Sequence, residues 1–237
     1  MREPFDPGSF YHVYNRGVDK RIIFSNAAEF NRFYESMYLF NDANYFHPGG
    51  DLLEKEVLLA GHEVLSMDRD PFVSIAAFCL KPNHFHMLLK QNKENGISKF
   101  LHKLMMGYAK YFNVKHERKG RLYESTFKAK PTVLEEHLHV LPRYIHLNAL
   151  DGTAVDWRTC WPPDPEKASR LLNAYRWSSH FVYATGEQSI PVVDVELVQS
   201  WFPDGDSYWK YLFSPEAFKD EELNFTRLLE TDYARKH

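Results

Sequence analysis

The sequence predicts an α+β fold: a ferredoxin-like antiparallel sheet with helices, followed by a small helical C-terminal extension. Elements in the first 150 residues follow the order strand, helix, strand, strand, helix, strand, helix. An apolar run at 73–80 precedes the turn Pro82-Asn83 and another strand. Tryptophan and proline residues at 157–165 mark a boundary. We therefore expect a domain at 1–150 with an insertion at 41–70, and an extension at 151–237.

The first half of the domain is expected to begin with a strand and a helix. Aromatic and β-branched residues mix at 9–18 and stop near Gly17, which predicts the strand. Apolar residues recur at helical spacing over 26–40, and Ser25 or Asn26 is suited to cap that helix. The segment 41–70 loses this periodicity, so it is treated as an insertion, with a short element at 57–64.

The second half is expected to supply two more helices and a strand. A continuous apolar stripe predicts a helix at 96–116, in which Tyr108 and Tyr111 are packing residues. Loose alternation predicts a strand at 122–133. A helix is expected at 135–150, and Pro142 should kink or restart it because proline removes a backbone donor. In the extension, aromatic cores are expected at 175–179, with Trp177 packed inside, and at 206–213.

Composition is that of an ordinary globular protein. The 237 residues include 44% hydrophobic and 26% charged residues. No apolar run approaches the ~20 residues of a membrane-spanning helix, and the N-terminus does not resemble a signal peptide. We therefore expect no membrane partner and a cytoplasmic location. Cys79 and Cys160 have no metal-ligand or disulfide spacing and are expected to be reduced thiols.

Positive charge is concentrated in the middle of the chain, although the net charge is −3. Lysine and arginine minus aspartate and glutamate gives −5 over 1–70, +8 over 71–150 and −6 over 151–237. A local basic surface can bind a phosphate backbone whatever the total charge. A lysine-rich solvated surface is the alternative. The basic residues expected to contact single-stranded or hairpin nucleic acid are Arg16, Lys115, Arg118, Lys119, Arg121, Lys128 and Lys130.

Two pairs of side chains carry the chemistry. Because side chains alternate along a strand, His84 and His86 share one face and can hold a metal ion, although a lone His-x-His is weak evidence. Tyr144 and Asn148 lie four residues apart on the last helix and can address a common point. His146 points elsewhere on that helix.

Four segments together resemble the single-tyrosine HUH transposases, which are IS200-like, and in particular their REP-associated tyrosine transposase branch. Their order and spacing span residues 9–150 and are more specific than any one piece. The segments are YHVYNRG at 11–17, KPNHFHMLL at 81–89, GRLY at 120–123 with FK at 127–128, and RYIHLN at 143–148.

The resemblance implies a metal-dependent endonuclease and strand-transferase acting on single-stranded, hairpin DNA. His84 and His86 match the paired histidines, Asn148 matches the third metal ligand, and Tyr144 matches the nucleophile. The family's ion is Mg²⁺ or Mn²⁺, and its intermediate is a covalent 5′-phosphotyrosine. Both a monomer and a homodimer are compatible with the sequence.

The chain departs from the family pattern at two places. Asn148 is followed by Ala149 where the family commonly has proline, and 124–126 replaces a stretch that often contains Gly-Arg. The second change removes a possible phosphate contact. Two alternatives to a strand-transferase are a non-catalytic nucleic-acid-binding regulator that keeps the fold, and a metallohydrolase that uses the histidines with an activated water.

Overall fold

A four-stranded antiparallel sheet forms the centre of the molecule. The computed structural model describes residues 4–45, 68–132, 137–160 and 163–214. The strand order is β2-β3-β1-β4, and every pairing is antiparallel. With one helix between the first two strands and one before the last, this is the predicted ferredoxin-like arrangement. The strands are β1 (Phe10–Arg16), β2 (Val73–Lys81), β3 (His84–Gln91) and β4 (Lys128–Pro131).

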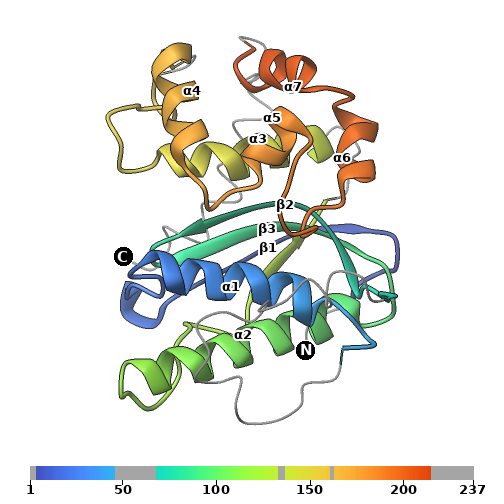
Figure 1. Ribbon diagram of the computed structural model, residues 1–237, viewed down its shortest axis with the longest axis vertical. Coiled ribbons are helices and arrows are strands. Elements are labelled where there is room, and N and C mark those ends of the chain that lie inside the picture. The colour runs from blue at the N-terminus through green and yellow to red at the C-terminus, as the bar shows by residue number, and fades with distance from the viewer. Residues whose placement is uncertain (1–3, 46–67, 133–136, 161–162, 215–237) are drawn as a thin grey trace.

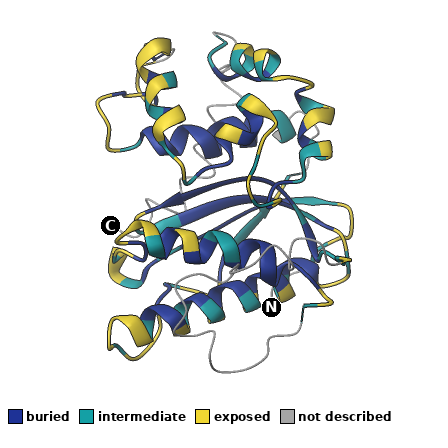
Figure 2. Ribbon diagram, in the orientation of Figure 1, coloured by how far each residue is buried: buried dark blue, intermediate teal, exposed yellow. Residues whose placement is uncertain are grey.

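Helices cover both faces of the sheet (Figure 1). α1 (Ala27–Phe40) and α2 (Gly96–Lys115) lie on one face, and α3 (His137–Leu147) lies on the other. Burial is greatest in the sheet and on the helix surfaces that face it (Figure 2). The other helical elements are η1 (Val18–Lys20), η4 (Asn148–Leu150), α4 (Pro165–Ala174), α5 (His180–Thr185), α6 (Val195–Trp201) and α7 (Gly205–Leu212).

The first two helices form where the sequence predicts them. Asn26 caps α1, because its side-chain oxygen accepts a hydrogen bond from the Glu29 backbone N–H at 3.1 Å. The predicted apolar stripe of α2 is buried, including Tyr108 and Tyr111, so both tyrosines are packing residues as expected. Phe33 of α1 packs against Phe85 of β3, with ring centroids 5.4 Å apart.

The segment 175–179 covers the exposed edge of β2. It is not helical but forms turns around an isolated bridge from Ser178 to Cys79: Leu80 N–H donates to Trp177 C=O at 2.8 Å, and Ser179 N–H donates to Phe78 C=O at 3.0 Å. Unpaired strand edges are prone to pair with other chains, and this segment occupies one of them. Trp177 stacks on Phe30 at 4.8 Å, so the prediction of core packing is confirmed.

A buried polar network connects α3 with the extension. His146 bonds to the Ser179 hydroxyl at 2.7 Å through Nε2 and to the Tyr208 hydroxyl at 2.9 Å through Nδ1. Tyr208 also bonds to His180 Nδ1 at 2.7 Å, and His180 Nε2 lies 3.2 Å from Asn173 Oδ1. The prediction that His146 points away from the Tyr144 site is therefore confirmed.

The predicted strand at 122–133 is wrong in its first half, because only Lys128–Pro131 pairs as β4. The side-chain amide of Asn15 donates to the carbonyl oxygens of Ser125 at 2.9 Å and Thr126 at 3.1 Å. Residues 125–126 therefore bind this amide and do not continue a strand. Tyr123 forms only an isolated bridge with Gly17.

The expected interruption at Pro142 is also wrong. α3 runs through Pro142, and the change of geometry comes at Asn148, where the 3₁₀ turn η4 begins. Proline removes a single donor in the middle of α3, and the helix continues on both sides of it. Residues 135–136 of the predicted helix and residue 133 of the predicted strand lie outside the described residues.

Several other predictions concern the periphery. Most of the predicted insertion, including 57–64, lies outside the described residues. Cys79 and Cys160 are free thiols, and none of the described helices is long and apolar enough to cross a bilayer.

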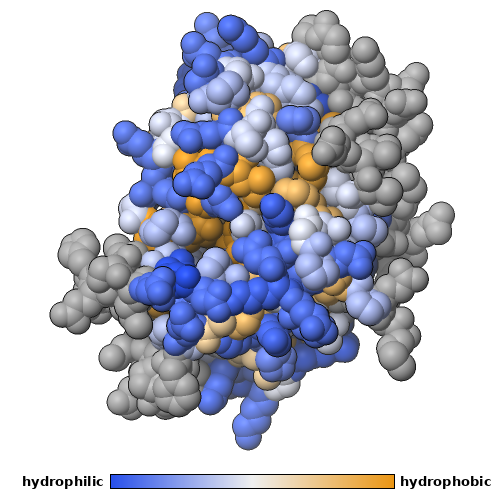
Figure 3. Space-filling model, turned by 90° about the vertical axis from the view of Figure 1, so that its right-hand side faces the viewer, coloured by the Kyte–Doolittle hydropathy of each residue, from blue (hydrophilic) through white to orange (hydrophobic). Residues whose placement is uncertain are grey.

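Figure 3 shows hydrophobic residues gathered above a hydrophilic band on the side of the molecule where α6 lies. Three half-buried residues of α6 pack against the core: Val195, Leu197 and Trp201.

We expect acidification to destabilise the fold through the buried network. Burial lowers the pKa of His180 from 6.5 to about 4, so the unfolded chain binds a proton first as the pH falls. The free energy of unfolding is therefore highest above pH 6.5 and falls progressively towards pH 4. Protonation linked to His180 alone lowers it by about 2 kcal/mol at pH 5. Urea unfolding at pH 7 and pH 5 measures this loss.

His180→Gln provides the comparison for this pH dependence. The variant should lose less stability between pH 7 and pH 5 than the wild type does. An equal loss in the two proteins would contradict the assignment to His180.

Candidate active site

The paired histidines lie on the face of the sheet that α3 covers. The rings of His84 and His86 have centroids 5.2 Å apart. Tyr144 of α3 stands edge-on to His86, with ring centroids 5.9 Å apart, whereas Phe85 packs on the opposite face against α1. The alternation predicted from the sequence is therefore confirmed.

A third histidine, His12 of β1, supports the pair. His12 Nε2 lies 3.0 Å from His86 Nδ1, and the side chain of His12 is buried. His84 Nδ1 donates to Asn83 Oδ1 at 2.6 Å. Each imidazole of the pair thus has a hydrogen-bond partner at Nδ1, and Nε2 is the nitrogen suited to bind a ligand. Sequence reasoning did not single out His12, although it lies on the same strand face as Tyr14 and Arg16 by alternation.

Both histidines of the pair are neutral at physiological pH. Burial, followed by the positive charge of Arg158, lowers the pKa of His86 to about 3, with Lys81 acting in the same direction and Asp151 opposing them. Burial also lowers the pKa of His84 well below its ordinary value, and His86 is the next largest cause. A neutral imidazole has the lone pair that metal ligation requires.

Lys81 joins the sheet to the helical segment that carries Tyr144. Its Nζ donates to the backbone carbonyl of Asn148 at 2.6 Å and to that of Asp151 at 3.1 Å. Carbonyls at the end of a helix lack partners within the helix and carry partial negative charge. The buried ammonium group binds both carbonyls, the first of which also accepts the Asp151 backbone N–H at 3.1 Å, and fixes the end of α3 and η4 above the histidines.

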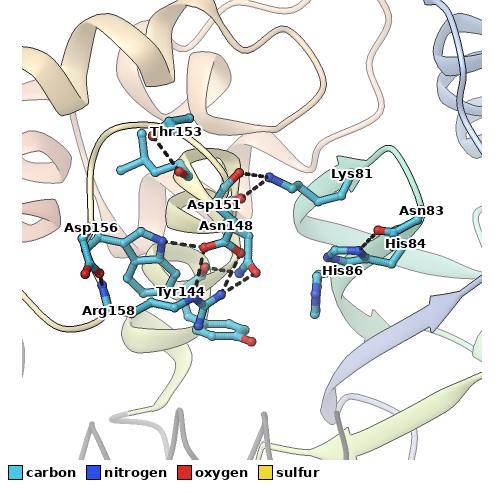
Figure 4. A network of polar contacts seen from close by, with 12 residues as sticks. Lys81, Asn83, His84, His86, Tyr144, Asn148, Asp151, Thr153, Asp156 and Arg158 are labelled. Carbon is cyan, nitrogen blue, oxygen red and sulfur yellow. Dashed lines mark hydrogen bonds and ion pairs between the residues drawn. The ribbon is translucent and has the colours of Figure 1, made fainter. Parts of the chain in front are cut away.

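Tyr144 and Asn148 are held together where α3 passes into η4. Asn148 Nδ2 donates to the Tyr144 backbone carbonyl at 2.6 Å. In Figure 4 the Tyr144 hydroxyl and the Asn148 amide lie on the side that faces His84 and His86. The structure therefore brings together the four residues proposed from the sequence as nucleophile and metal ligands, and their roles remain predictions.

Arg158, from the loop after η4, is a further member of this cluster. It forms an ion pair with Asp151, Nη2 to Oδ2 at 2.8 Å, and Nη2 also donates to Asn148 Oδ1 at 3.2 Å. Its guanidinium carbon lies 4.2 Å from the Trp157 ring centroid and 5.9 Å from that of Tyr144. Sequence reasoning missed Arg158, because a loop without periodicity gives no signal of what its side chains contact.

Residues 53–148 match the family model described as transposase IS200 like. Over this segment the chain is similar to the IS200-like transposases. The matched part of the chain contains Lys81, both paired histidines, Tyr144 and Asn148, whereas His12 and Arg158 lie outside it. The match begins within the segment 41–70 that was predicted to be an insertion.

Comparisons with curated proteins and with solved structures gave one similar structure. No curated protein matches the chain. A solved structure of a REP-associated tyrosine transposase bound to a REP hairpin aligns with a TM-score of 0.47 at 10% sequence identity. The alignment covers 81% of this chain and 88% of that chain.

The basic residues predicted to bind DNA fall into two groups. Arg16, Lys128 and Lys130 share the sheet face of the histidines, since Tyr14 pairs with both His86 and Lys128. Arg16 forms an ion pair with Glu124 at 2.7 Å. The second group lies at the end of α2 and in the loop that follows: Lys115, Arg118, Lys119 and Arg121. The structure does not bring these two groups of side chains together.

A groove of about 1350 Å³ lies away from the histidine site, between α2 and the segment 120–127. Its lining includes the apolar Met105 and Met106 and the basic Lys103, Lys110 and Arg121. Because α2 covers the opposite face of the sheet from α3 (Figure 1), this groove is separate from the candidate active site.

The side chains at the site include some, but not all, of the ligands that a divalent ion needs. Two neutral imidazoles and an amide oxygen are acceptable ligands for such an ion. Among the residues that the structure describes, no group of three His, Cys, Asp or Glu side chains is arranged to hold a metal. A complete protein site therefore needs the amide of Asn148, and solvent or phosphate oxygens would fill the other positions.

We expect Lys81→Met to destabilise the protein by about 1–3 kcal/mol, because the Asp151 carbonyl loses the Lys81 donor and the Asn148 carbonyl keeps only the Asp151 N–H. Lys99→Met is the matched control, since Lys99 is exposed on α2. Urea unfolding of the two variants measures the difference. Equal stabilities would show that the contact from Lys81 to η4 contributes nothing.

Proposed function

We propose that this protein is a metal-dependent, single-stranded DNA endonuclease and strand-transferase with Tyr144 as its nucleophile. The observation that carries the proposal is the packing of Tyr144 beside His86, at a ring-centroid distance of 5.9 Å, within a region that matches a transposase family model. A phenol beside two neutral imidazoles suits nucleophilic attack at a phosphate held there. DNA hairpins are the proposed substrate.

The reaction begins with attack of Tyr144 Oη on the scissile phosphorus. The hydroxyl proton passes to solvent, the new O–P bond forms, and the bond from phosphorus to the 3′-oxygen breaks. The leaving 3′-oxygen takes up a proton, and the 5′-phosphate stays covalently attached to Tyr144. A later attack by a 3′-hydroxyl reverses these steps and joins the strands.

His84, His86 and Asn148 are the proposed ligands of Mg²⁺ or Mn²⁺. When bound, the ion supplies positive charge to the phosphate. His12 orients His86 through the bond at Nδ1, so that Nε2 points at the ligand position. Lys81 holds the backbone of Asn148 and thereby positions its side chain.

DNA is proposed to cross the sheet face that carries the histidines. Arg16, Lys128 and Lys130 line that face and provide positive charge for a phosphate backbone. The departure at 124–126 has a consequence here, because Glu124 pairs with Arg16. An incoming phosphate must compete with this carboxylate for the guanidinium group.

We expect Tyr144→Phe to abolish the covalent protein–DNA adduct, because the attacking oxygen is gone. The measurement is incubation with a library of single-stranded hairpins and Mn²⁺, followed by a denaturing gel. Tyr34→Phe is the matched control, because Tyr34 contacts the Ile190 carbonyl and lies outside the site.

The same gel separates this function from its two alternatives. If the protein is a metallohydrolase that uses an activated water, the Tyr144→Phe variant will still cleave DNA. If it is a binding protein without catalysis, the wild-type protein will bind hairpins but form no covalent adduct. Either result would overturn the proposal.

We expect His12→Phe to weaken Mn²⁺ binding about 10- to 100-fold, because His86 loses the partner that fixes its ring. Titration calorimetry of wild type and variant measures the change, with His86→Ala as the reference for loss of a ligand. Wild-type affinity in His12→Phe would show that the contact between the two imidazoles does not orient the ligand.

A further inference from the structure

We propose that Arg158 is a catalytic residue of the strand-transferase, a guanidinium delivered by the C-terminal extension that binds the scissile phosphate beside Tyr144. This inference rests on the proposed function. It concerns a residue outside the 53–148 region that matches the transposase family.

The position of Arg158 links the three parts of the site. Its Nη2 donates to Asn148 Oδ1 at 3.2 Å, and its guanidinium carbon lies 5.9 Å from the Tyr144 ring centroid. Figure 4 shows the guanidinium group next to Tyr144 and Asn148. A phosphate in reach of the Tyr144 hydroxyl is therefore also in reach of Arg158.

Asp151 is the main hydrogen-bond partner of the guanidinium group and holds it in place. Nε donates to Asp151 Oδ1 at 2.9 Å and Nη2 to Oδ2 at 2.8 Å. The Trp157 indole N–H donates to the same Asp151 carboxylate at 2.9 Å, and its ring lies under the guanidinium at 4.2 Å. Lys81 binds the Asp151 backbone carbonyl at 3.1 Å. An arginine fixed on two sides loses little side-chain freedom when it binds substrate.

Exposure distinguishes Arg158 from a purely structural ion pair. Its side chain is 33% exposed, whereas Tyr144 and Asn148 are 4% and 2% exposed. A phosphate approaching from solvent therefore meets Arg158 before it reaches Tyr144. It can take over the donor that points to Asn148, while Asp151 keeps its bond to Nε.

The chemistry needs positive charge at this point. As the Tyr144 oxygen forms its bond to phosphorus and the 3′-oxygen leaves, negative charge remains on the non-bridging phosphate oxygens. A planar guanidinium binds two such oxygens at once. Fixed donors of this kind contribute about 10²- to 10³-fold to rate when they contact charge in the transition state.

The test compares Arg158→Ala with Arg170→Ala, an exposed arginine on α4, in the full chain. A hairpin that forms the wild-type adduct is used with Mn²⁺ to measure single-turnover adduct rates. Binding of the same hairpin is measured by fluorescence anisotropy in EDTA. We expect the adduct rate of Arg158→Ala to fall about 10²- to 10³-fold, while its Kd changes less than about threefold and Arg170→Ala matches wild type.

Two further measurements separate a chemical role from a structural one. Methylguanidinium added to Arg158→Ala should restore part of the lost rate and leave wild type unchanged, which a misfolded loop would not allow. Arg158→Lys should fold and retain an intermediate rate, because it keeps the charge but not the planar pair of donors. Asp151→Asn should lower the rate less than Arg158→Ala, since it only loosens the guanidinium.

Each outcome decides the matter. Adduct rates of Arg158→Ala and Arg158→Lys equal to that of Arg170→Ala would overturn the inference and leave the proposed function intact. A rate loss that methylguanidinium does not restore, with Arg158→Lys as slow as Arg158→Ala, would assign Arg158 a structural role instead. A wild-type protein that forms no adduct with any hairpin of the library would overturn the proposed function itself, and the inference with it.

Discussion

The buried ammonium group of Lys81 is the contact on which the arrangement of the site depends. It lies at the end of β2, next to the turn that leads to His84, and it binds the backbone carbonyls of Asn148 and Asp151. The sheet supplies the histidines, and the segment after α3 supplies Asn148 and the loop to Arg158. Because few other polar groups can satisfy two helix-end carbonyls in a buried position, one lysine couples the two layers at the point where the chemistry is proposed.

The remaining contacts between the layers keep the helical side of the molecule from moving as a separate unit. Segment 175–179 hydrogen-bonds along β2, and His146 connects α3 to Ser179 and Tyr208. These contacts lie on the far side of α3 from Tyr144. The nucleophile thus stands on a helix held from both sides, which favours a fixed geometry over a mobile one.

Much of the fold and part of the site follow from the sequence. Alternation places His84 and His86 on one face, and helical spacing places Tyr144 and Asn148 on one side of α3, without reference to tertiary structure. Their meeting rested on the family resemblance. His12 was missed because alternation shows which side of its own strand a residue faces, but not which strand lies next to it. Arg158 and the role of Lys81 were missed because a loop and a single lysine acquire their partners only through long-range packing. The errors at 122–127 and Pro142 share this origin, since the Asn15 amide and the packing of α3 override local preference.

The central claim is that His84, His86 and Asn148 of one chain converge on a single divalent ion beside Tyr144. A crystal structure of the protein soaked with Mn²⁺, with an anomalous difference map, tests it most directly. The account predicts one strong peak bonded to Nε2 of both histidines, with the Asn148 side-chain oxygen as a third ligand and the Tyr144 hydroxyl next to it. A peak elsewhere, or none at this position with Mn²⁺ bound at another site, would contradict the account.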